Sequence, residues 1–184
     1  MIKSRIIILK ISFIALFSAL IFVCAAFLAI PYAGGAGYFN FSDILILFSS
    51  AYLSPEVGLI AGIIGSSMSD LYAGFANCIP FTIVAKGLEA IAFSLIFFIF
   101  RKHKYLKYIS FIIAPLFMVV SYIPYYLLYD NGAGIMALIS SCYDLLQGAI
   151  SSVGAIFLYS VFIKVKLPFA QFSILNYKEK NIKK

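Results

Sequence analysis

The chain has 184 residues, of which 64% are hydrophobic and only 11% are charged, and its formal net charge is +7. A soluble domain uses roughly 25% charged residues, so this composition excludes an ordinary water-soluble enzyme or binding domain. The basic residues flank apolar segments instead of forming a groove, which argues against nucleic-acid binding and favours contact with anionic lipid. We therefore expect an all-α integral membrane protein that forms one membrane domain over residues 1–184.

Apolar segments along the chain predict six transmembrane helices. A span needs about 20 mainly apolar residues, and the expected spans cover residues 10–30, 41–53, 57–72, 80–100, 108–128 and 135–163. The second span is short and is stopped by Ser54, which can cap the next helix. Pro55 suits the first position of that helix, and Glu56 suits the positive end of its dipole. Because the second span is short, five or seven spans stay open as alternatives.

The basic residues predict an orientation. An even number of spans places both termini on one side of the membrane, together with the segment 101–107. Every Lys and Arg except Lys86 then falls on that side, including those of the basic tail 164–184. The opposite loops, 31–40, 74–79 and 129–134, contain no Lys or Arg. By the positive-inside rule both termini are cytoplasmic, and we expect a multi-pass protein of a bacterial plasma membrane.

Motifs for catalysis do not emerge from the sequence. The single histidine, His103, lies in a basic cytoplasmic loop, where a solvated and inert side chain is expected. The three cysteines show no metal-ligand spacing and no disulfide framework. Nor does the sequence contain a phosphate-binding Gly-Lys-Ser/Thr motif. We therefore expect no catalytic residue, no metal ion and no cofactor in this chain.

Ionisable residues inside the predicted spans point to a binding site, because such groups are costly in a membrane and usually functional. Lys86 and Glu89 are three residues apart on one helix face, so a ligand contact and a purely structural ion pair are both open. Asp144 and Gln147 repeat this spacing and offer an anion, an amide donor and an amide acceptor, which suit a heteroaromatic ring edge. With Asp70, these groups fall mainly in the outer half of the membrane and predict a pocket there.

Two other acidic residues have local interpretations. Asp43 follows Asn40 by three residues, which resembles a capping box at the start of the second helix, and ligand contact is the alternative. Asp130 begins an Asp-Asn-Gly sequence, a strong turn signal.

Aromatic residues gather on the same outer side. Four tyrosines recur at helical spacing at the outer end of the fifth span: Tyr122, Tyr125, Tyr126 and Tyr129. An interfacial aromatic belt is the alternative interpretation. Pro124 interrupts this stripe and favours a kink toward a cavity, and Tyr38 lies in the first outer loop. Aromatic walls with a few convergent polar groups suit a small planar ligand.

Small residues form stripes that let helix backbones approach closely in a bilayer. The first span contains Ala15-x-x-x-Ala19 and the third contains Gly58-x-x-x-Gly62. Packing within the protein and docking of another membrane subunit are both open.

The order of several short motifs resembles the substrate-binding subunits, or S-components, of energy-coupling factor (ECF) vitamin transporters. The likeness is detailed over roughly the first five-eighths of the chain and rests on helix layout beyond it. It is closest to the branch associated with riboflavin, hydroxymethylpyrimidine and vitamin B6-like substrates. The motifs are Gly37-Tyr38-Phe39-Asn40-Phe41-Ser42-Asp43, Leu53-Ser54-Pro55-Glu56-Val57-Gly58, Ala61-Gly62-Ile63-Ile64-Gly65-Ser66, Ser69-Asp70-Leu71, Pro80-Phe81-Thr82 and Lys86-Gly87.

The resemblance implies a non-catalytic subunit that captures a B-vitamin or its precursor outside the cell. Its implied partners are a membrane coupling subunit, which Ala15 and Ala19 would contact, and two cytoplasmic ATPase subunits that drive import. The residue patterns and the resemblance together predict these substrate-binding residues: Tyr38, Asn40, Asp70, Lys86, Glu89, Tyr122, Tyr125, Asp144 and Gln147. One alternative is a small membrane enzyme or a stand-alone ion-coupled carrier that uses the Lys86–Glu89 pair, and another is a structural subunit without a ligand.

Overall fold

The computed structural model describes residues 2–32, 37–129 and 134–165. These residues form six α-helices, two short strands and two 3-10 turns. In chain order the elements are α1 (Ile2–Phe27), β1 (Ile30–Tyr32), β2 (Gly37–Phe39), α2 (Ser42–Tyr52), α3 (Pro55–Tyr72), η2 (Ala76–Cys78), α4 (Ile79–Phe100), η3 (Leu106–Tyr108), α5 (Ile109–Tyr129) and α6 (Ile135–Val165).

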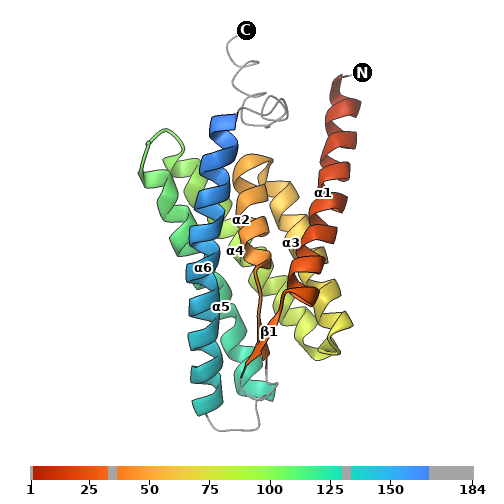
Figure 1. Cartoon of the computed structure of the whole chain (residues 1–184), viewed down its shortest axis with the longest axis vertical. Helices are drawn as coiled ribbons and strands as arrows, with labels where there is room; N and C mark the ends of the chain where they lie inside the picture. Colours follow the sequence, from red (N-terminus) through yellow and green to blue (C-terminus); the bar gives the residue numbers. More distant parts are fainter. Residues whose placement is uncertain (1, 33–36, 130–133, 166–184) are drawn as a thin grey trace.

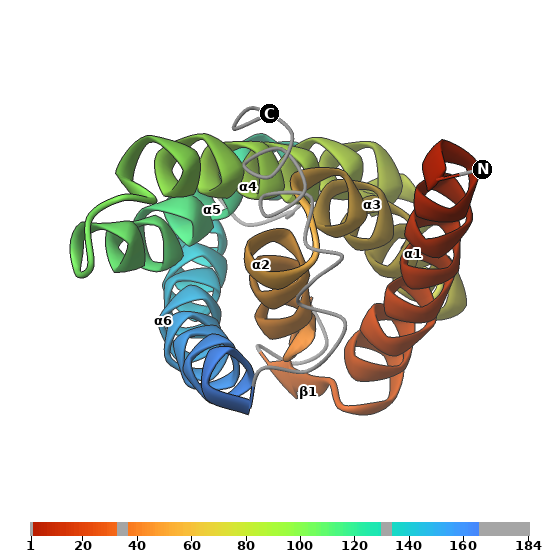
Figure 2. The same cartoon turned by 90° about the horizontal axis from the view of Figure 1, so that it is seen from above.

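Helix α2 lies at the centre of the bundle. Figure 2 shows α1, α3, α4, α5 and α6 arranged as an arc around it, and successive helices of this arc pack on one another. Helix α2 contacts α1, α3, α4 and α6. Most of its side chains are buried, among them Ile46 and Leu47. The neighbouring helices therefore cover this short helix on most of its surface.

The long helices have the composition of membrane spans. Four segments are long and apolar enough to cross a bilayer, namely Ile6–Phe27, Ala76–Phe100, Leu106–Tyr129 and Ala137–Val165. Large apolar side chains such as Leu95, Ile99 and Val153 are exposed on the outside of the bundle, as lipid contact requires. The prediction of a helical integral membrane protein is confirmed at this level. Helix α2, with 11 residues, is about 16 Å long, roughly half the thickness of a bilayer core.

The first outer loop contains a short β-hairpin that the sequence analysis did not predict. Strands β1 and β2 are antiparallel and pair Ile30 with Phe39 and Pro31 with Tyr38. Helix α1 accordingly ends at Phe27, before the expected end of the first span at residue 30. Pro31 explains this difference, because proline lacks an amide N–H and disfavours helical backbone at the residue before it.

The two short helices α2 and α3 begin in different ways. At the start of α3 the Ser54 side chain accepts a hydrogen bond from the Val57 amide, with Pro55 in the first turn, so the predicted cap is confirmed. At the start of α2 the expected capping box is wrong. The N-cap residue is Phe41, whose side chain makes no cap hydrogen bond. The Asn40 side chain accepts a hydrogen bond from the Ser42 amide, but the Asn40 amide bonds to Gln147 and not to Asp43. Asp43 therefore has a different role, which its contacts in the pocket region define.

Glycines on α3 allow close helix packing inside the protein. A Cβ atom added at Gly65 would lie 2.6 Å from the Ser18 carbonyl oxygen on α1. A Cβ atom at Gly58 would overlap the Ser50 side chain on α2. The small-residue stripe of α3 thus packs within the bundle. By contrast, Ala15 on α1 is exposed on the outer surface.

The two ends of the bundle are formed by different elements. Figure 1 shows the start of α1, the end of α6 and the connection between α4 and α5 at one end, and the β-hairpin at the other. The first of these ends contains a cluster of interlocking rings, in which Phe93 and Phe111 meet edge to face at 4.8 Å between centroids. We call this cluster the aromatic core. Its members are Phe48, Tyr52, Phe93, Phe97, Phe111, Tyr159 and Phe162.

Candidate ligand-binding site

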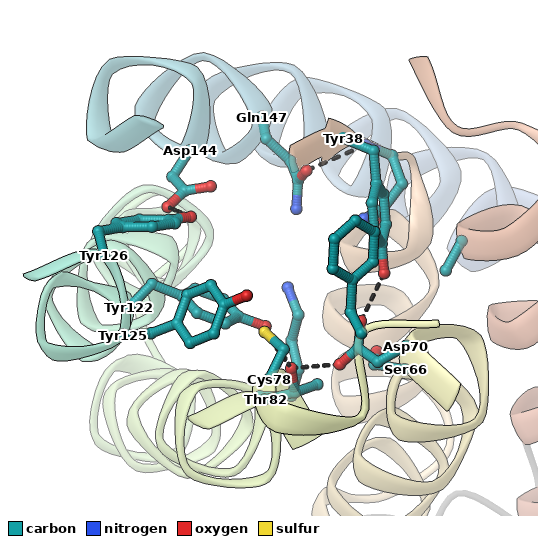
Figure 3. A pocket seen from close by; sticks show the side chains of 14 residues that line it. Tyr38, Ser66, Asp70, Cys78, Thr82, Tyr122, Tyr125, Tyr126, Asp144 and Gln147 are labelled. Atoms are coloured by element: carbon teal, nitrogen blue, oxygen red, sulfur yellow. Dashed lines mark hydrogen bonds between the residues drawn. The ribbon is translucent and has the colours of Figure 1, made fainter. Parts of the chain in front are cut away.

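A polar pocket lies at the hairpin end of the bundle (Figure 3). It contains about 600 Å³ of space free of protein atoms, its open mouth included. All predicted substrate-binding residues except Glu89 line it. They are Tyr38, Asn40, Asp70, Lys86, Tyr122, Tyr125, Asp144 and Gln147. The structure therefore brings together residues from β2, α3, α4, α5 and α6 and from the segment before α2.

The base of the pocket is a buried ion pair between Lys86 and Asp43. The Lys86 Nζ lies 2.5 Å from the Asp43 Oδ1, and both side chains are almost fully buried. The Gln147 Nε2 donates a hydrogen bond to the other carboxylate oxygen of Asp43 at 2.7 Å. Asp43 thus accepts a charge-assisted hydrogen bond at one oxygen and an amide hydrogen bond at the other, so both of its carboxylate oxygens have partners.

Gln147 also fixes the segment that leads into α2. Its Oε1 accepts a hydrogen bond from the Asn40 backbone N–H at 3.0 Å. The Asn40 side-chain oxygen in turn accepts hydrogen bonds from the Ser42 amide and hydroxyl, at 3.0 and 2.5 Å. The amide oxygen and one N–H direction of Gln147 are therefore used within the protein. Gln147 thus positions Asn40 and Asp43 at the base of the pocket.

A second network is centred on Asp70 at the end of α3. The Tyr38 hydroxyl donates to the Asp70 Oδ1 at 2.5 Å, and the Thr82 hydroxyl donates to the Oδ2. The Tyr122 hydroxyl then donates to the Thr82 Oγ1 at 3.0 Å. Burial, and after it the Asp70 charge, raises the pKa of Tyr38 far above its usual value, so this hydroxyl stays protonated as a donor. The network links β2, α3, α4 and α5 around one wall of the pocket.

Asp144 lies on the opposite side of the pocket. The Tyr126 hydroxyl donates to its Oδ2 at 2.7 Å. Figure 3 shows the Asp144 carboxylate directed toward the open space between Tyr126 and Gln147. A carboxylate held in this way can accept a hydrogen bond from an N–H or O–H group of a ligand.

Aromatic rings form two walls of the pocket. On α5 the rings of Tyr122 and Tyr126 lie 6.2 Å apart, and those of Tyr125 and Tyr126 lie 5.7 Å apart. Across the pocket Tyr38 packs against Phe75 with centroids 6.0 Å apart. Figure 3 shows open space between the α5 tyrosines and Tyr38. A flat ring fits such an arrangement because it can contact aromatic faces on both sides.

Glu89 does not line the pocket. Its side chain is fully buried below the base, and its Oε2 lies 3.7 Å from the Lys86 Nζ. Within the described residues, neither of its carboxylate oxygens has a hydrogen-bond partner. The predicted pairing of Lys86 with Glu89 is thus present, but Asp43 is the closer partner of Lys86.

Sequence reasoning did not single out several lining residues, which are Ala25, Ser66, Phe75, Cys78, Thr82 and Tyr126. Tyr126 belongs to the tyrosine stripe of α5 and Thr82 to one of the recognised motifs, so a sequence pattern indicated each of these two residues. Ser66 shares a face of α3 with Asp70, four residues further on. A hydroxyl in an apolar helix is too common to mark a site by itself. Among the described residues there is no group of three or more metal-ligating side chains.

Apolar helices of spanning length together with a polar pocket are typical of a multi-pass membrane protein that binds a small molecule. The comparison with known families makes this class specific. The chain belongs to the family "ECF-type riboflavin transporter, S component", whose model matches residues 5–167. It is therefore a substrate-binding transporter subunit of the cell membrane, and this family is not one of enzymes.

A curated relative matches a shorter part of the chain. It is described as "Uncharacterized protein in gap 3'region" of Pyrococcus woesei and is 39% identical over 62 residues. The match covers 34% of this chain and 41% of the relative, so the chain spans about two-fifths of that protein's length.

Proposed function

We propose that this subunit captures a B-vitamin or vitamin precursor with a planar heteroaromatic ring, and that the polar pocket is the capture site. The candidates are riboflavin, hydroxymethylpyrimidine and pyridoxine-like compounds, and the family description makes riboflavin the first to test. The observation that carries the proposal is the convergence of Lys86, Asp70 and Asp144 between two aromatic walls. Buried ionisable groups in a membrane protein are retained mainly where a ligand or a pathway needs them.

The pocket offers complementary contacts to such a ring. The Lys86 ammonium can donate to a ring nitrogen or carbonyl, and the Asp144 carboxylate can accept from an amino or hydroxyl group. The ring itself would pack against Tyr122 and Tyr125 on α5. Asp70 is already bonded to Tyr38 and Thr82, so it holds these two side chains in place.

We further propose a topology of six spans within one membrane domain, with both termini in the cytoplasm. The basic segment 101–107, Lys10 and Lys164 belong to the end of the bundle opposite the hairpin (Figure 1). The positive-inside rule places that end in the cytoplasm and the pocket toward the outside. Helix α2 is too short to cross alone, and its neighbours shield it from lipid.

Import would be driven by ATP hydrolysis in partner subunits, through a membrane coupling subunit and two cytoplasmic ATPases. The exposed Ala15 and Ala19 on α1 support a role as the contact with the coupling subunit, because small residues allow close helix approach. The substitution Ala15→Trp is expected to stop vitamin uptake by the complete transporter while the isolated subunit binds its vitamin normally. Normal uptake by this variant would remove the proposed contact.

Isothermal titration of the purified full chain in detergent with a B-vitamin panel tests the capture function. We expect one vitamin to bind, and the substitution Asp144→Ala to weaken it by about tenfold or more, since a hydrogen bond to a charged group contributes about 1.5–3 kcal/mol. Lys104→Ala, in the segment between α4 and α5, is the matched control and is expected to leave affinity unchanged. Binding of no vitamin, or equal affinities in all three proteins, would contradict the proposal.

A further inference from the structure

The charges beneath the pocket do not balance if every group is ionised. Lys86 faces two carboxylates, those of Asp43 and Glu89, and within the described residues no second Lys or Arg is buried. The pocket above adds Asp70 on α3 and Asp144 on α6, which are also buried. Burying an ionised carboxylate without full compensation is so costly that such a group usually takes up a proton instead.

The contacts distinguish the two carboxylates next to Lys86. Asp43 lies at hydrogen-bond distance from the ammonium, 2.5 Å, and its other oxygen accepts from Gln147. Glu89 lies 3.7 Å from the same ammonium, is fully buried, and neither of its oxygens has a hydrogen-bond partner among the described side chains and backbone. The protein therefore solvates a negative charge at Asp43 and provides little solvation for one at Glu89.

We propose that Glu89 is a proton-binding site, which carries a proton at neutral pH while Asp43 supplies the counter-charge of Lys86. The titratable groups that line the pocket next to Lys86 include Asp70 on α3, Tyr122 on α5 and Asp144 on α6, together with Tyr38 on β2 (Figure 3). None of these groups brings a second cation, so Lys86 is the one cation paired with Glu89 among the described residues. The Tyr122 ring lies 6.0 Å from the Lys86 Nζ and brings no cation.

This site explains how a lysine with two carboxylate neighbours can serve a ligand. With the proton on Glu89, the Lys86–Asp43 pair is neutral as a whole and the ammonium keeps a donor direction for the pocket. Glu89 keeps its proton because its carboxylate lacks the hydrogen-bond partners that Asp43 has. The inference therefore does not depend on which vitamin binds.

Infrared spectroscopy of the ligand-free full chain in lipid nanodiscs tests the proposal, because a protonated carboxylic acid has its own C=O stretching band. At pH 7 we expect the wild-type spectrum to contain an acid band that is absent from Glu89→Gln. The control Glu56→Gln removes an exposed carboxylate on α3 and is expected to leave the band in place. Bands from Asp70 or Asp144 remain in every variant and cancel in the difference spectra.

A second variant tests whether Glu89 keeps its proton because Lys86 pairs with Asp43. Asp43→Asn removes the preferred partner of Lys86, so the ammonium is expected to pair with Glu89, which then ionises, and the acid band disappears although Glu89 is still present. A melting curve shows that each variant is folded. Identical acid bands in the wild type and Glu89→Gln would overturn the proposal, and so would a Glu89 band, identified by that difference spectrum, that persists in Asp43→Asn. Since no ligand is used, neither result bears on vitamin capture.

Discussion

The two ends of the bundle are built by different interactions. At the aromatic core, ring faces and edges interlock, and Phe93 and Phe111 are fully buried. At the pocket end, side-chain hydrogen bonds join the elements, such as Tyr38 with Asp70 and Gln147 with Asp43. Lipid removes the hydrophobic driving force between helices, so packing and polar bonds are left to hold a membrane bundle together. We infer that the aromatic core provides stability and the pocket end provides binding.

The largest effect is expected for Lys86→Ala. Lys86 contributes to both stability and binding, so this variant departs from the division between the two ends. Removing the cation leaves Asp43 buried without compensation, at a cost of about 3–5 kcal/mol in the free energy of unfolding. It also removes a donor from the pocket, so affinity for the vitamin is expected to fall by at least about tenfold. Thermal unfolding and isothermal titration in detergent measure the two effects.

The double variant Lys86→Met with Asp43→Asn is the control for this prediction. It replaces the buried ion pair by uncharged side chains of similar size, so stability is expected to recover while binding does not. If stability and binding both recover, or if neither recovers, the Lys86–Asp43 pair does not combine a role in stability with a role in binding.

The substitution Phe93→Ala tests the division between the two ends at the aromatic core. It leaves a cavity in the aromatic core and is expected to lower the free energy of unfolding by about 3 kcal/mol. The vitamin affinity of the folded fraction should stay within about twofold, because Phe93 belongs to the opposite end of the bundle from the pocket. A large loss of affinity with little change in melting temperature would contradict the division into two ends.

The substitution Tyr126→Phe is expected to have a smaller effect, confined to the pocket end. It removes the hydrogen bond to the Asp144 carboxylate, which typically contributes about 1 kcal/mol, so affinity should fall by about three- to tenfold. Tyr129→Phe changes a neighbouring exposed tyrosine of the same helix and is the matched control for titration. Equal losses in both variants would show that α5 responds as a whole and that the Asp144 contact is not specific.

The smallest effect is expected for Lys10→Ala, at the end of the bundle opposite the pocket. Lys10 pairs with Glu56 at 3.3 Å, with 29% and 56% of the two side chains exposed. Exposed pairs contribute about 1 kcal/mol or less. Melting temperature and vitamin affinity should both change little, and a marked loss of affinity would show coupling between the two ends.

The sequence predicted much of the pocket because ionisable residues inside a membrane segment are conspicuous. Lys86 and Asp144 could be recognised from their surroundings alone. For Asp43 the sequence leaves a local cap and ligand contact both open, since its spacing from Asn40 has a local explanation. Its actual partners, Lys86 and Gln147, are distant in the sequence and are brought near only by tertiary packing.

The arrangement of the helices was harder to predict than their existence. The apolar segments indicated where the helices lie, and Ser54 indicated where α3 begins. The central position of α2 depends on close contacts, such as Gly58 on α3 against Ser50, that no single-chain pattern encodes. The hairpin had one signal, Pro31, but the pairing of Pro31 with Tyr38 joins two residues across a turn that the sequence alone does not specify.

Mass spectrometry of small molecules released from the purified full chain, expressed alone in rich medium, tests the central claim most directly. We predict one stoichiometric heteroaromatic vitamin or precursor in the wild type and a much lower amount in Asp144→Ala, which removes a contact of the pocket. A wild-type protein that carries no such molecule and also binds none of the vitamin panel would contradict the account.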